Sequence, residues 1–339
     1  MCPNDGMPFA EVCRFYRNAA SSIDAELTTV FLTSPTNEPE PDSTYLHTSE
    51  LKDTRAIARQ IDAQLEAEWD LVLCHRYRAY WADALSNLDN KKCVAVAHEF
   101  GMLRRWQRRA SRKVYAREIA FAGVSPAVTD ELARSVPQTH TLPNGLDLSS
   151  WADRLQTREA ALAGLGLDPG PFTIGVVGRL HYKKRPELAL AAYRQFRNTN
   201  ADSRLVFIGD GELQADDPEV HLLGRVDDAR YLFAAFDVLL MTATEDEAFG
   251  MVALEALAAG VPVVTASIPG PKYVLEDLGF YAQTDSVDDY VTALKAVQRC
   301  DRAALLDAGR QRISKEFSLS ATARRLDDLL VTRRAFRSL

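Results

Sequence analysis

The feature that most constrains the fold is a regular alternation of short apolar runs with longer amphipathic segments. Runs such as "DLVLCHR" (70–76), "KCVAVAH" (92–98) and "DVLLMTA" (237–243) have the length and apolar content of buried strands. Between such runs lie helical patterns such as "RPELALAAYRQFR" (185–197). This alternation is typical of βαβ units, whose parallel strands are covered by helices on both faces. We therefore expect an α/β fold.

The chain has 339 residues, a length that favours two domains. Asn144-Gly145 and "LDPGPF" (167–172) interrupt the alternation, so the hinge is expected at 145–170. We predict one Rossmann-like domain over 1–155, a second over 165–317, and a closing helix over 318–339 that crosses back to the first domain. The other expected elements are a helix over 50–68 and strands over 25–34, 120–125, 138–145, 172–180, 203–211, 220–224 and 261–267.

Composition excludes several functional classes. The net charge of −7 argues against a general nucleic-acid binder. The five cysteines are scattered, with no pair at metal-ligand spacing, so we expect reduced thiols and no metal site. No apolar run approaches the roughly 18 residues of a membrane span, and "MCPNDGMPF" has no features of a secretory signal. We expect a cytoplasmic protein that can touch a membrane surface.

The N-terminus departs from the usual start of a doubly wound domain, which is a central strand, a glycine loop and a helix. Here "NDGMPFAEVCRFYRNAASS" already has the pattern of the loop and the helix, and very few residues precede it. We expect the first strand to be absent or shortened, or to belong to a segment upstream of this chain.

The first chemical motif is "VVGRLHYKKRP" (176–186), where a predicted strand ends at Gly178. Arg179 and Lys184 follow at the carboxyl edge of the sheet, where open α/β sheets bind ligands. Two cations around one turn can clasp a diphosphate. The alternative is a basic, solvated turn in which Lys183, Lys184 and Arg185 are all exposed.

The second motif is "EDEAFGMVALEALAAG" (245–260), in which Gly250 allows a tight turn into an apolar helix. The N-terminus of such a helix is an anion site. Glu247 lies in the loop before it and Glu255 about one turn inside it. Carboxylates accept hydrogen bonds from pairs of sugar hydroxyls, so the arrangement suits a nucleotide sugar. Alternatively, Glu247 only favours the helix dipole and Glu255 is a surface residue.

Together these pieces resemble the GT-B retaining glycosyltransferases of family 4 (glycosyl transferases group 1), which include bacterial polysaccharide and lipopolysaccharide sugar transferases. The resemblance implies two Rossmann-like domains that face a central cleft. The matching segments are "LPNGLD" (142–147), "VGRLHYKK" (177–184), "LVFIGDGEL" (205–213), "LLGRV" (222–226), "EAFGMVALEALAAGVPVV" (247–264) and "EFSLSATARRLDDLL" (316–330).

The resemblance also implies a role for each matching residue. Arg179 and Lys184 would bind the donor diphosphate and stabilise the leaving nucleotide, and Glu247 would hold hydroxyls of the transferred sugar. The other implied donor-site residues are Glu255 at the ribose, the amides of Phe249, Gly250, Met251 and Val252 at the phosphates, Arg225 beside the nucleobase, His98 near the sugar, and Gly6 in the first-domain loop. For His98, a histidine satisfied in the core is the alternative reading.

The implied reaction is transfer of a sugar, with retention at the anomeric carbon, from a UDP- or GDP-sugar to a glycan or glycolipid, without a metal or a cofactor. Fixed cations and a helix N-terminus can stabilise a leaving diphosphate. The family often reads G-G-x-P-E where this chain has "SIPGPKY" (267–273), with Lys272 in place of the acid, which leaves sugar recognition open. The alternatives are a catalytically silent GT-B protein that binds a glycan or a partner, and a sugar-nucleotide epimerase.

A basic segment, "MLRRWQRRASRKVYAR" (102–117), contains seven basic residues and no acid. At helical spacing, four arginines share one face: Arg105, Arg108, Arg109 and Arg112. We expect this face to dock on anionic lipid or on a phosphorylated glycolipid, at the inner face of the cytoplasmic membrane. A solvated helix face is the alternative.

Overall fold

The computed structural model divides the chain into two compact units, and each is described by itself. The first unit comprises Met1–Gly145 together with the chain from Phe317 onward, and the second comprises Leu146–Glu316. Both units are built from parallel strands and helices. The structure describes residues 1–6, 9–36, 38–46, 48, 51–66, 68–90, 92–105, 108, 119–226 and 229–331.

The second unit contains a parallel sheet of six strands in the order β11-β10-β9-β12-β13-β14. After β9, the chain adds β10 and β11 on one side of it and then adds β12, β13 and β14 on the other side. This is the doubly wound arrangement. The boundary between β9 and β12 is therefore the topological switch point. The strands are β9 (Phe172–Val177), β10 (Ser203–Ile208), β11 (Val220–Leu222), β12 (Val238–Met241), β13 (Val263–Ala266) and β14 (Phe280–Ala282).

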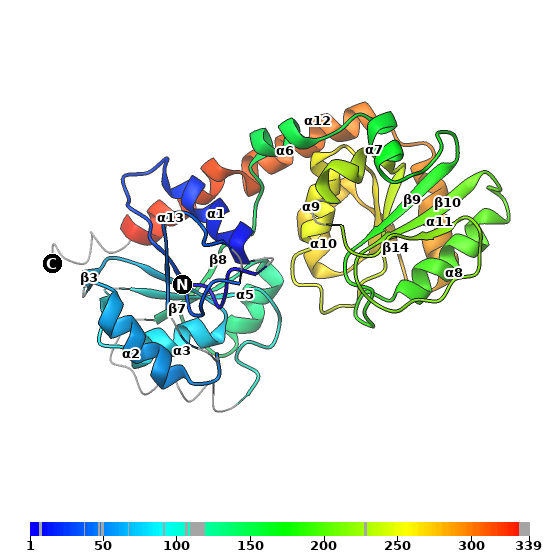
Figure 1. Ribbon diagram of the computed structural model, residues 1–339. Helices are drawn as coiled ribbons and strands as arrows, with labels where there is room; N and C mark the ends of the chain where they lie inside the picture. Colours follow the sequence, from blue (N-terminus) through cyan, green and yellow to red (C-terminus); the bar gives the residue numbers. More distant parts are fainter. Residues whose placement is uncertain are drawn as a thin grey trace. The chain divides into compact units, whose positions relative to one another are not determined.

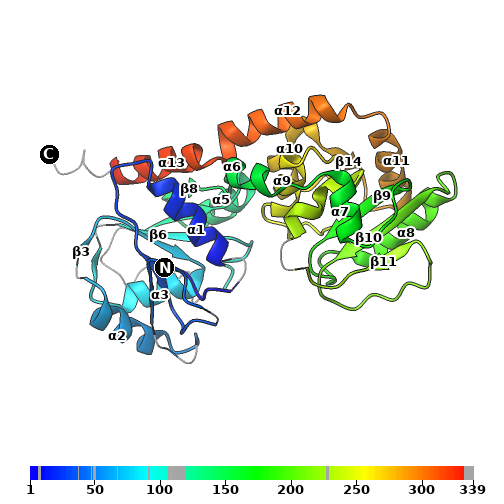
Figure 2. The same ribbon diagram turned by 45° about the horizontal axis from the view of Figure 1, so that its top comes forward.

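Helices cover this sheet because their apolar residues recur at helical spacing. In α8, Ala189, Tyr193 and Phe196 lie on one face and are fully buried. Helix α8 packs against α11, and α9 packs against α12 (Figure 2). The helices are α6 (Leu148–Arg154), α7 (Arg158–Gly164), α8 (Pro186–Arg197), α9 (Met251–Ala258), α10 (Pro269–Leu275), α11 (Val287–Val297) and α12 (Arg302–Arg312), with 3-10 turns Ala229–Ala235 and Glu276–Leu278 and a π turn Ile313–Phe317.

The first unit contains a parallel sheet of four strands in the order β4-β6-β7-β8. Two further strands, β1 and β2, form a parallel pair beside it. The strands are β1 (Thr29–Phe31), β2 (Ser43–Tyr45), β4 (Val72–His75), β6 (Cys93–Ala97), β7 (Ile119–Gly123) and β8 (Thr139–Thr141), and the two-residue strands β3 (Glu68–Trp69) and β5 (Asp89–Asn90) pair with each other.

Residues Met1 and Cys2 connect the two parts of this sheet. The Cys2 amide donates to the Val30 carbonyl at 2.8 Å, and the Leu32 amide donates to the Cys2 carbonyl at 3.0 Å. On the other side, the Met1 nitrogen donates to the Leu73 carbonyl at 2.6 Å and the His75 amide donates to the Met1 carbonyl at 3.0 Å. The strands of the first unit therefore lie in the order β2, β1, Met1-Cys2, β4, β6, β7, β8. The first six positions follow the same doubly wound order as the second unit, and the two residues Met1 and Cys2 occupy the position of the first strand.

The helices of the first unit are α1 (Phe9–Ala20), α2 (Thr54–Gln64), α3 (Tyr77–Leu85), α5 (Pro126–Ala133) and α13 (Leu319–Val331). Figure 1 shows α1 and α13 side by side on one face of the sheet and α2 and α3 on the other. Helix α2 is shorter than the expected helix over 50–68, because Asp53 caps its start and the backbone becomes extended at Leu65.

Most expected strands occur within their expected ranges, and the differences are at the edges of the sheets. The strand expected over 25–34 is limited to β1, whereas β2 and β14 were not expected because each is a three-residue edge strand without a long apolar run. Within the described ranges, none of the helices combines the length and apolarity that a membrane crossing requires.

Candidate functional site

The turn that follows β9 is fastened to the end of the neighbouring strand β12. The Thr242 hydroxyl donates to the carbonyls of Lys184 and Arg185 at 2.7 and 2.9 Å, and the Arg185 Nε donates to the Thr242 carbonyl at 2.6 Å. The Thr244 amide donates to the Lys183 carbonyl at 2.9 Å. These bonds fix the backbone of Lys184 at the switch point.

Lys184 and Glu247 form an ion pair at this switch point. The Lys184 Nζ contacts one carboxylate oxygen of Glu247, and the other oxygen accepts the Gly250 amide at 3.1 Å. Lys184 comes from the turn after β9 and Glu247 from the loop after β12, so adjacent strands bring together residues that are 63 positions apart. The side chains are 36% and 18% exposed, so both are accessible to a ligand.

The N-terminus of α9 begins beside Glu247. Gly250 has φ of +93°, a left-handed conformation that glycine adopts without steric cost, and it starts the helix without a side-chain cap. The Glu247 carboxylate binds the Gly250 amide. The Met251 and Val252 amides belong to the first helical turn, whose N–H groups lack intrahelical acceptors. The helix start can therefore bind an anion.

The first turn of α10 packs directly on the Glu247 loop. A Cβ atom on Gly270 would lie 2.3 Å from the Glu247 carbonyl oxygen and 2.7 Å from the Phe249 nitrogen. Pro271 also lies next to Gly250, where an added Cβ would be 3.3 Å from the proline ring. Lys272 is exposed, and its Nζ lies 3.5 Å from the Ser267 hydroxyl. Gly270 therefore allows the close approach that supports Glu247.

The other expected donor-site residues of this unit differ in exposure. Arg179 is exposed and makes no ion pair or side-chain hydrogen bond with the described part of the chain. Glu255 is half-buried on α9, and Arg225 is exposed in the loop after β11. The alternative of a basic, solvated turn does not describe these residues fully, because two of them form ion pairs. Lys183 pairs with Asp246 at 3.1 Å, and Arg185 pairs with Asp285 at 2.8 Å.

In the first unit, His98 follows β6 and contacts His75, the last residue of β4. The His75 Nδ1 and the His98 Nε2 lie 2.9 Å apart. Burial lowers the pKa of His98 to about 4, with a smaller contribution from the Arg76 charge. Burial and the neighbouring His98 also lower the pKa of His75 well below its usual value. Both rings are therefore neutral at pH 7 and act as hydrogen-bonding groups.

His75 was missed by sequence reasoning, although a signal for it exists. "DLVLCHR" and "KCVAVAH" each carry a histidine at the strand end, and the carboxyl ends of adjacent parallel strands lie together. Gly6, the expected loop glycine, accepts the Phe9 amide at its carbonyl at 2.8 Å and donates its own amide to the Asn4 side chain at 3.1 Å. Gly6 thus closes the turn that leads into α1.

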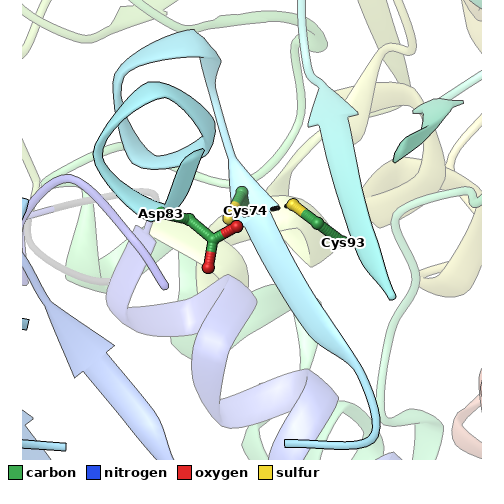
Figure 3. Close-up of side chains that lie close together, drawn as sticks. All are labelled: Cys74, Asp83 and Cys93. Atoms are coloured by element: carbon green, nitrogen blue, oxygen red, sulfur yellow. Dashed lines mark hydrogen bonds between the residues drawn. The ribbon is translucent and has the colours of Figure 1, made fainter. Parts of the chain in front are cut away.

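Three buried side chains of the first unit bring together atoms that are able to bind a metal ion. Cys74 on β4, Cys93 on β6 and Asp83 on α3 have donor atoms within 4.8 Å of one another (Figure 3). The Cys93 thiol lies 3.8 Å from the Cys74 sulfur, and this bond, followed by burial, raises the pKa of Cys93 well above its usual value. A metal ion binds deprotonated thiols, and the raised pKa of Cys93 makes this deprotonation unfavourable. We therefore assign the cluster to core packing.

Two of the four arginines of the expected basic face, Arg109 and Arg112, lie outside the described residues. Arg105 is exposed. Arg108 donates to the Met102 carbonyl at 3.1 Å, and its guanidinium lies 4.7 Å from the centre of the Tyr77 ring. Of the two described arginines, Arg105 is thus the one whose side chain is open to solvent.

Each unit matches a family model. Residues 16–150 match the model described as glycosyltransferase family 4, and residues 171–299 match the one described as glycosyl transferases group 1. The chain belongs to glycosyltransferase family 4. The first match lies in the first unit except for its last residues, and the second match contains both Lys184 and Glu247.

Curated relatives of this family 4 chain include enzymes with different acceptors. The chain is 29% identical over 233 residues to a D-inositol 3-phosphate glycosyltransferase of Segniliparus rotundus, covering 61% of this chain and 49% of the relative. It is 28% identical over 171 residues to a UDP-Gal:alpha-D-GlcNAc-diphosphoundecaprenol alpha-1,3-galactosyltransferase of Escherichia coli, covering 46% and 44%. The match thus spans about half the length of these relatives.

Solved structures show the fold of the family 4 chain. Sucrose-phosphate synthase from Thermosynechococcus elongatus superposes with a TM-score of 0.76 at 18% identity, covering 99% of this chain and 95% of that one. HepE from Anabaena, in complex with UDP and glucose, superposes with a TM-score of 0.73 at 17% identity, covering 97% of each chain. The expected α/β fold of the GT-B type is confirmed.

Proposed function

We propose that the protein transfers a sugar from a nucleotide-sugar donor to a hydroxyl of a glycan or glycolipid. The observation that carries the proposal is the meeting of Lys184, Glu247 and the start of α9 at the switch point of the second unit. In doubly wound sheets this edge binds nucleotides. A cation, a carboxylate and free helix amides in one place suit a diphosphate joined to a polyol.

Donor binding, in this proposal, exchanges the partners of the ion pair. Without a ligand, Glu247 neutralises Lys184 and binds the Gly250 amide. The donor diphosphate would take Lys184, Arg179 and the amides of α9, and the sugar hydroxyls would donate to the released Glu247 carboxylate. Glu255 would accept the ribose hydroxyls. Lys184 and Glu247 would lose each other, but each would gain a partner on the donor. The new hydrogen bonds would offset the desolvation cost of separating the ion pair.

The proposed chemistry follows from the charge that develops on the leaving group. Breaking the bond between the anomeric carbon and the phosphate oxygen builds negative charge on the diphosphate. The acceptor hydroxyl oxygen forms the new bond to that carbon, and its proton passes to the departing phosphate oxygen. Lys184, whose backbone is held by Thr242, and the exposed Arg179 are positive groups that would stabilise this charge more strongly than they stabilise the intact donor. We infer that these cations serve in place of a metal ion, that the anomeric configuration is retained, and that His98, as a neutral ring, hydrogen-bonds to the transferred sugar.

Two relatives favour a UDP-sugar as the donor. The HepE structure contains UDP and glucose, and the Escherichia coli relative is named for UDP-Gal. The named acceptors of the relatives, an inositol phosphate and a diphosphoundecaprenol-linked sugar, are a polyol and a glycolipid. We infer a glycan or glycolipid acceptor in surface polysaccharide assembly, at the inner face of the cytoplasmic membrane, with the exposed Arg105 near anionic headgroups.

The test begins with a thermal-shift panel of UDP-, GDP-, ADP- and TDP-sugars, because a ligand of the folded state raises Tm. The stabilising donor is then used in hydrolysis and transfer assays with Lys184→Ala and Glu247→Gln. Each variant should lower turnover by about 100-fold or more. The matched controls Lys183→Ala and Asp246→Asn remove the neighbouring exposed ion pair and should keep near-normal turnover.

Four outcomes would contradict parts of this proposal. Unchanged turnover in Lys184→Ala and Glu247→Gln would remove the catalytic assignment. Donor binding without hydrolysis or transfer to any acceptor would favour the silent GT-B protein. Exchange of a sugar-ring proton with solvent, in the absence of an acceptor, would favour an epimerase. Inversion at the anomeric carbon of the product, seen by NMR, would contradict retention alone.

A further inference from the structure

His75 and His98 share one hydrogen bond between their rings, at the carboxyl ends of adjacent strands. His75 is the last residue of β4, and His98 follows β6, which pairs with β4 in a parallel ladder. The His75 Nδ1 and the His98 Nε2 lie 2.9 Å apart, and the ring centres are 5.1 Å apart. Each ring is neutral at pH 7 and therefore carries one N–H. One of the two facing nitrogens must then donate, and the other must accept.

The two rings differ in their access to solvent. His75 is 4% exposed, and the ring of Tyr16 on α1 packs against it with the centres 5.2 Å apart. His98 is half-buried, and the Phe9 ring meets it edge to face with the centres 6.0 Å apart. A nitrogen of His75 that lacks a partner inside the protein therefore finds none in solvent, whereas the His98 ring is partly open to a ligand.

The second nitrogen of His75 determines which ring donates. Among the described residues, the His75 Nε2 has no hydrogen-bond partner, because the one bond of this side chain is made by Nδ1. A proton on Nε2 would be a buried N–H without an acceptor, and such groups are rarer in folded proteins than acceptors without a donor. The proton of His75 therefore lies on Nδ1, and this nitrogen donates to the His98 Nε2.

This donation fixes the tautomer of His98. A neutral imidazole that accepts at Nε2 carries its proton on Nδ1. In the part of the chain that the structure describes, the His98 Nδ1 has no hydrogen-bond partner, and its ring is only half-buried. The group that His98 offers to a ligand is thus an N–H donor. The opposite tautomer would offer a lone pair, which accepts only from a group that brings a proton.

We propose that His75 is a positioning residue, whose Nδ1–H holds His98 in the tautomer that donates from Nδ1 to an oxygen of the transferred sugar. This inference rests on the proposed sugar transfer, in which His98 contacts that sugar, and His75 itself touches no substrate. Because the donated bond needs an acceptor, the sugar carries an oxygen at the position that faces His98. A hydroxyl, a carbonyl or a carboxylate meets this requirement, and a sugar that is deoxygenated there does not.

The first test reads the tautomer of His98 in the protein without substrate. Long-range proton–nitrogen NMR spectra of protein labelled at its histidines show which nitrogen of each ring carries the proton. The signals of His98 are identified by their absence from the spectrum of His98→Gln. We expect the protons of both His75 and His98 on Nδ1. A proton on the His98 Nε2 would overturn the proposal, whatever the activity of the protein.

The second test changes the donor at position 75. His75→Leu fills a similar volume without a donor, whereas His75→Asn places an amide N–H close to the position of Nδ1. We expect His75→Leu to lower kcat for sugar transfer about tenfold, as expected for the loss of one hydrogen bond in the transition state. The His98 proton should also move toward Nε2 in this variant. His75→Asn should rescue both kcat and the tautomer.

The combined results separate this inference from the proposed function. Equal losses of kcat in His75→Leu and His75→Asn, with the tautomer of His98 unchanged, would assign His75 to core packing and overturn its positioning role. An active parent protein with the proton on the His98 Nε2 would overturn this inference alone. An inactive parent with the proton on Nδ1 would contradict the proposed function instead. If His75→Leu does not fold, the spectrum of the parent still decides.

Discussion

Lys184 and Glu247 neutralise each other at the switch point of the second unit, although they follow different strands. A half-exposed pair of this kind adds little to stability, because solvent screens it and both side chains lose conformational freedom. The pair lies at the edge where doubly wound sheets bind ligands, so we propose that its importance lies in binding.

A double-mutant cycle separates these two contributions. We expect Lys184→Ala, Glu247→Ala and the double variant to give a coupling below about 1 kcal/mol in the free energy of unfolding. The same variants should lower donor affinity at least about tenfold, since the diphosphate loses a cation and the sugar loses an acceptor. Chemical denaturation and calorimetric titration of the donor measure the two quantities. A large coupling in stability with unchanged donor affinity would assign the pair a structural role.

The His75–His98 pair predicts a loss of stability in mild acid. The pKa of His98 is lowered to about 4 and that of His75 is also lowered, so the unfolded chain binds these protons more readily than the folded one. The stabilisation is fully present above about pH 6.5 and is lost as the pH falls from there toward 4. Tm measured between pH 7.5 and 5 should fall less steeply in His98→Gln than in the parent. An equal slope in both proteins would exclude this pair as the source.

Gly270 should tolerate no side chain. In Gly270→Ala the new Cβ would meet the backbone of Glu247 and Phe249 at under 3 Å, so the loop that carries Glu247 must move. We expect the free energy of unfolding to fall by about 1–3 kcal/mol and donor binding to weaken. Gly164→Ala is the matched control, because its Cβ would meet only Leu232 at 3.8 Å at the end of α7. Normal donor binding in Gly270→Ala would show that the loop adapts.

Asp237 should be important for the stability of the second unit. Its carboxylate accepts the Thr173 amide at 2.8 Å and pairs with Arg158 at 2.7 Å and Arg302 at 3.5 Å. Asp237→Ala leaves two cations together and one amide without its acceptor, so we expect a loss of about 2 kcal/mol or more. Asp217→Ala removes an exposed pair with Arg194 and should cost less than about 1 kcal/mol. Denaturant melts of the two variants provide the comparison, and equal losses would contradict this reading.

The proposed contact with anionic lipid is tested with vesicles. Arg105 is exposed, so Arg105→Glu should reduce sedimentation with vesicles that contain phosphatidylglycerol and leave binding to neutral vesicles unchanged. Added salt should weaken binding of the parent protein. Arg134→Glu, which changes an exposed arginine at the end of α5, is the charge-matched control. Identical binding of Arg105→Glu and the parent would remove this part of the proposal.

The sequence predicted the repeated units of the fold well, because buried parallel strands are short apolar runs. It located Phe172–Val177, Ser203–Ile208 and Val238–Met241 within longer expected ranges. It did not predict Ser43–Tyr45, which is polar, or Phe280–Ala282, which is short, since edge strands have less apolar surface to bury. A first strand that is absent, shortened or upstream of this chain was expected, but not that Met1 and Cys2 would bridge two strands.

The candidate site could be predicted only in part. Local pattern identified Lys184 and Glu247 separately, because each follows a strand end. Their contact depends on β9 and β12 being neighbours, and the order of strands in a sheet is set by the packing of the whole unit. His75 was missed for the same reason, since its pairing with His98 requires β4 to lie beside β6.

The discontinuity of the first unit has a consequence for synthesis on the ribosome. The second unit is one continuous segment, Leu146–Glu316, whereas the first needs α13, which packs on α1. Translation therefore synthesises every residue of the second unit before it makes α13. The unit whose synthesis starts first is the last to be completed, and the face of α1 that α13 will cover stays open to chaperones until the final helix emerges.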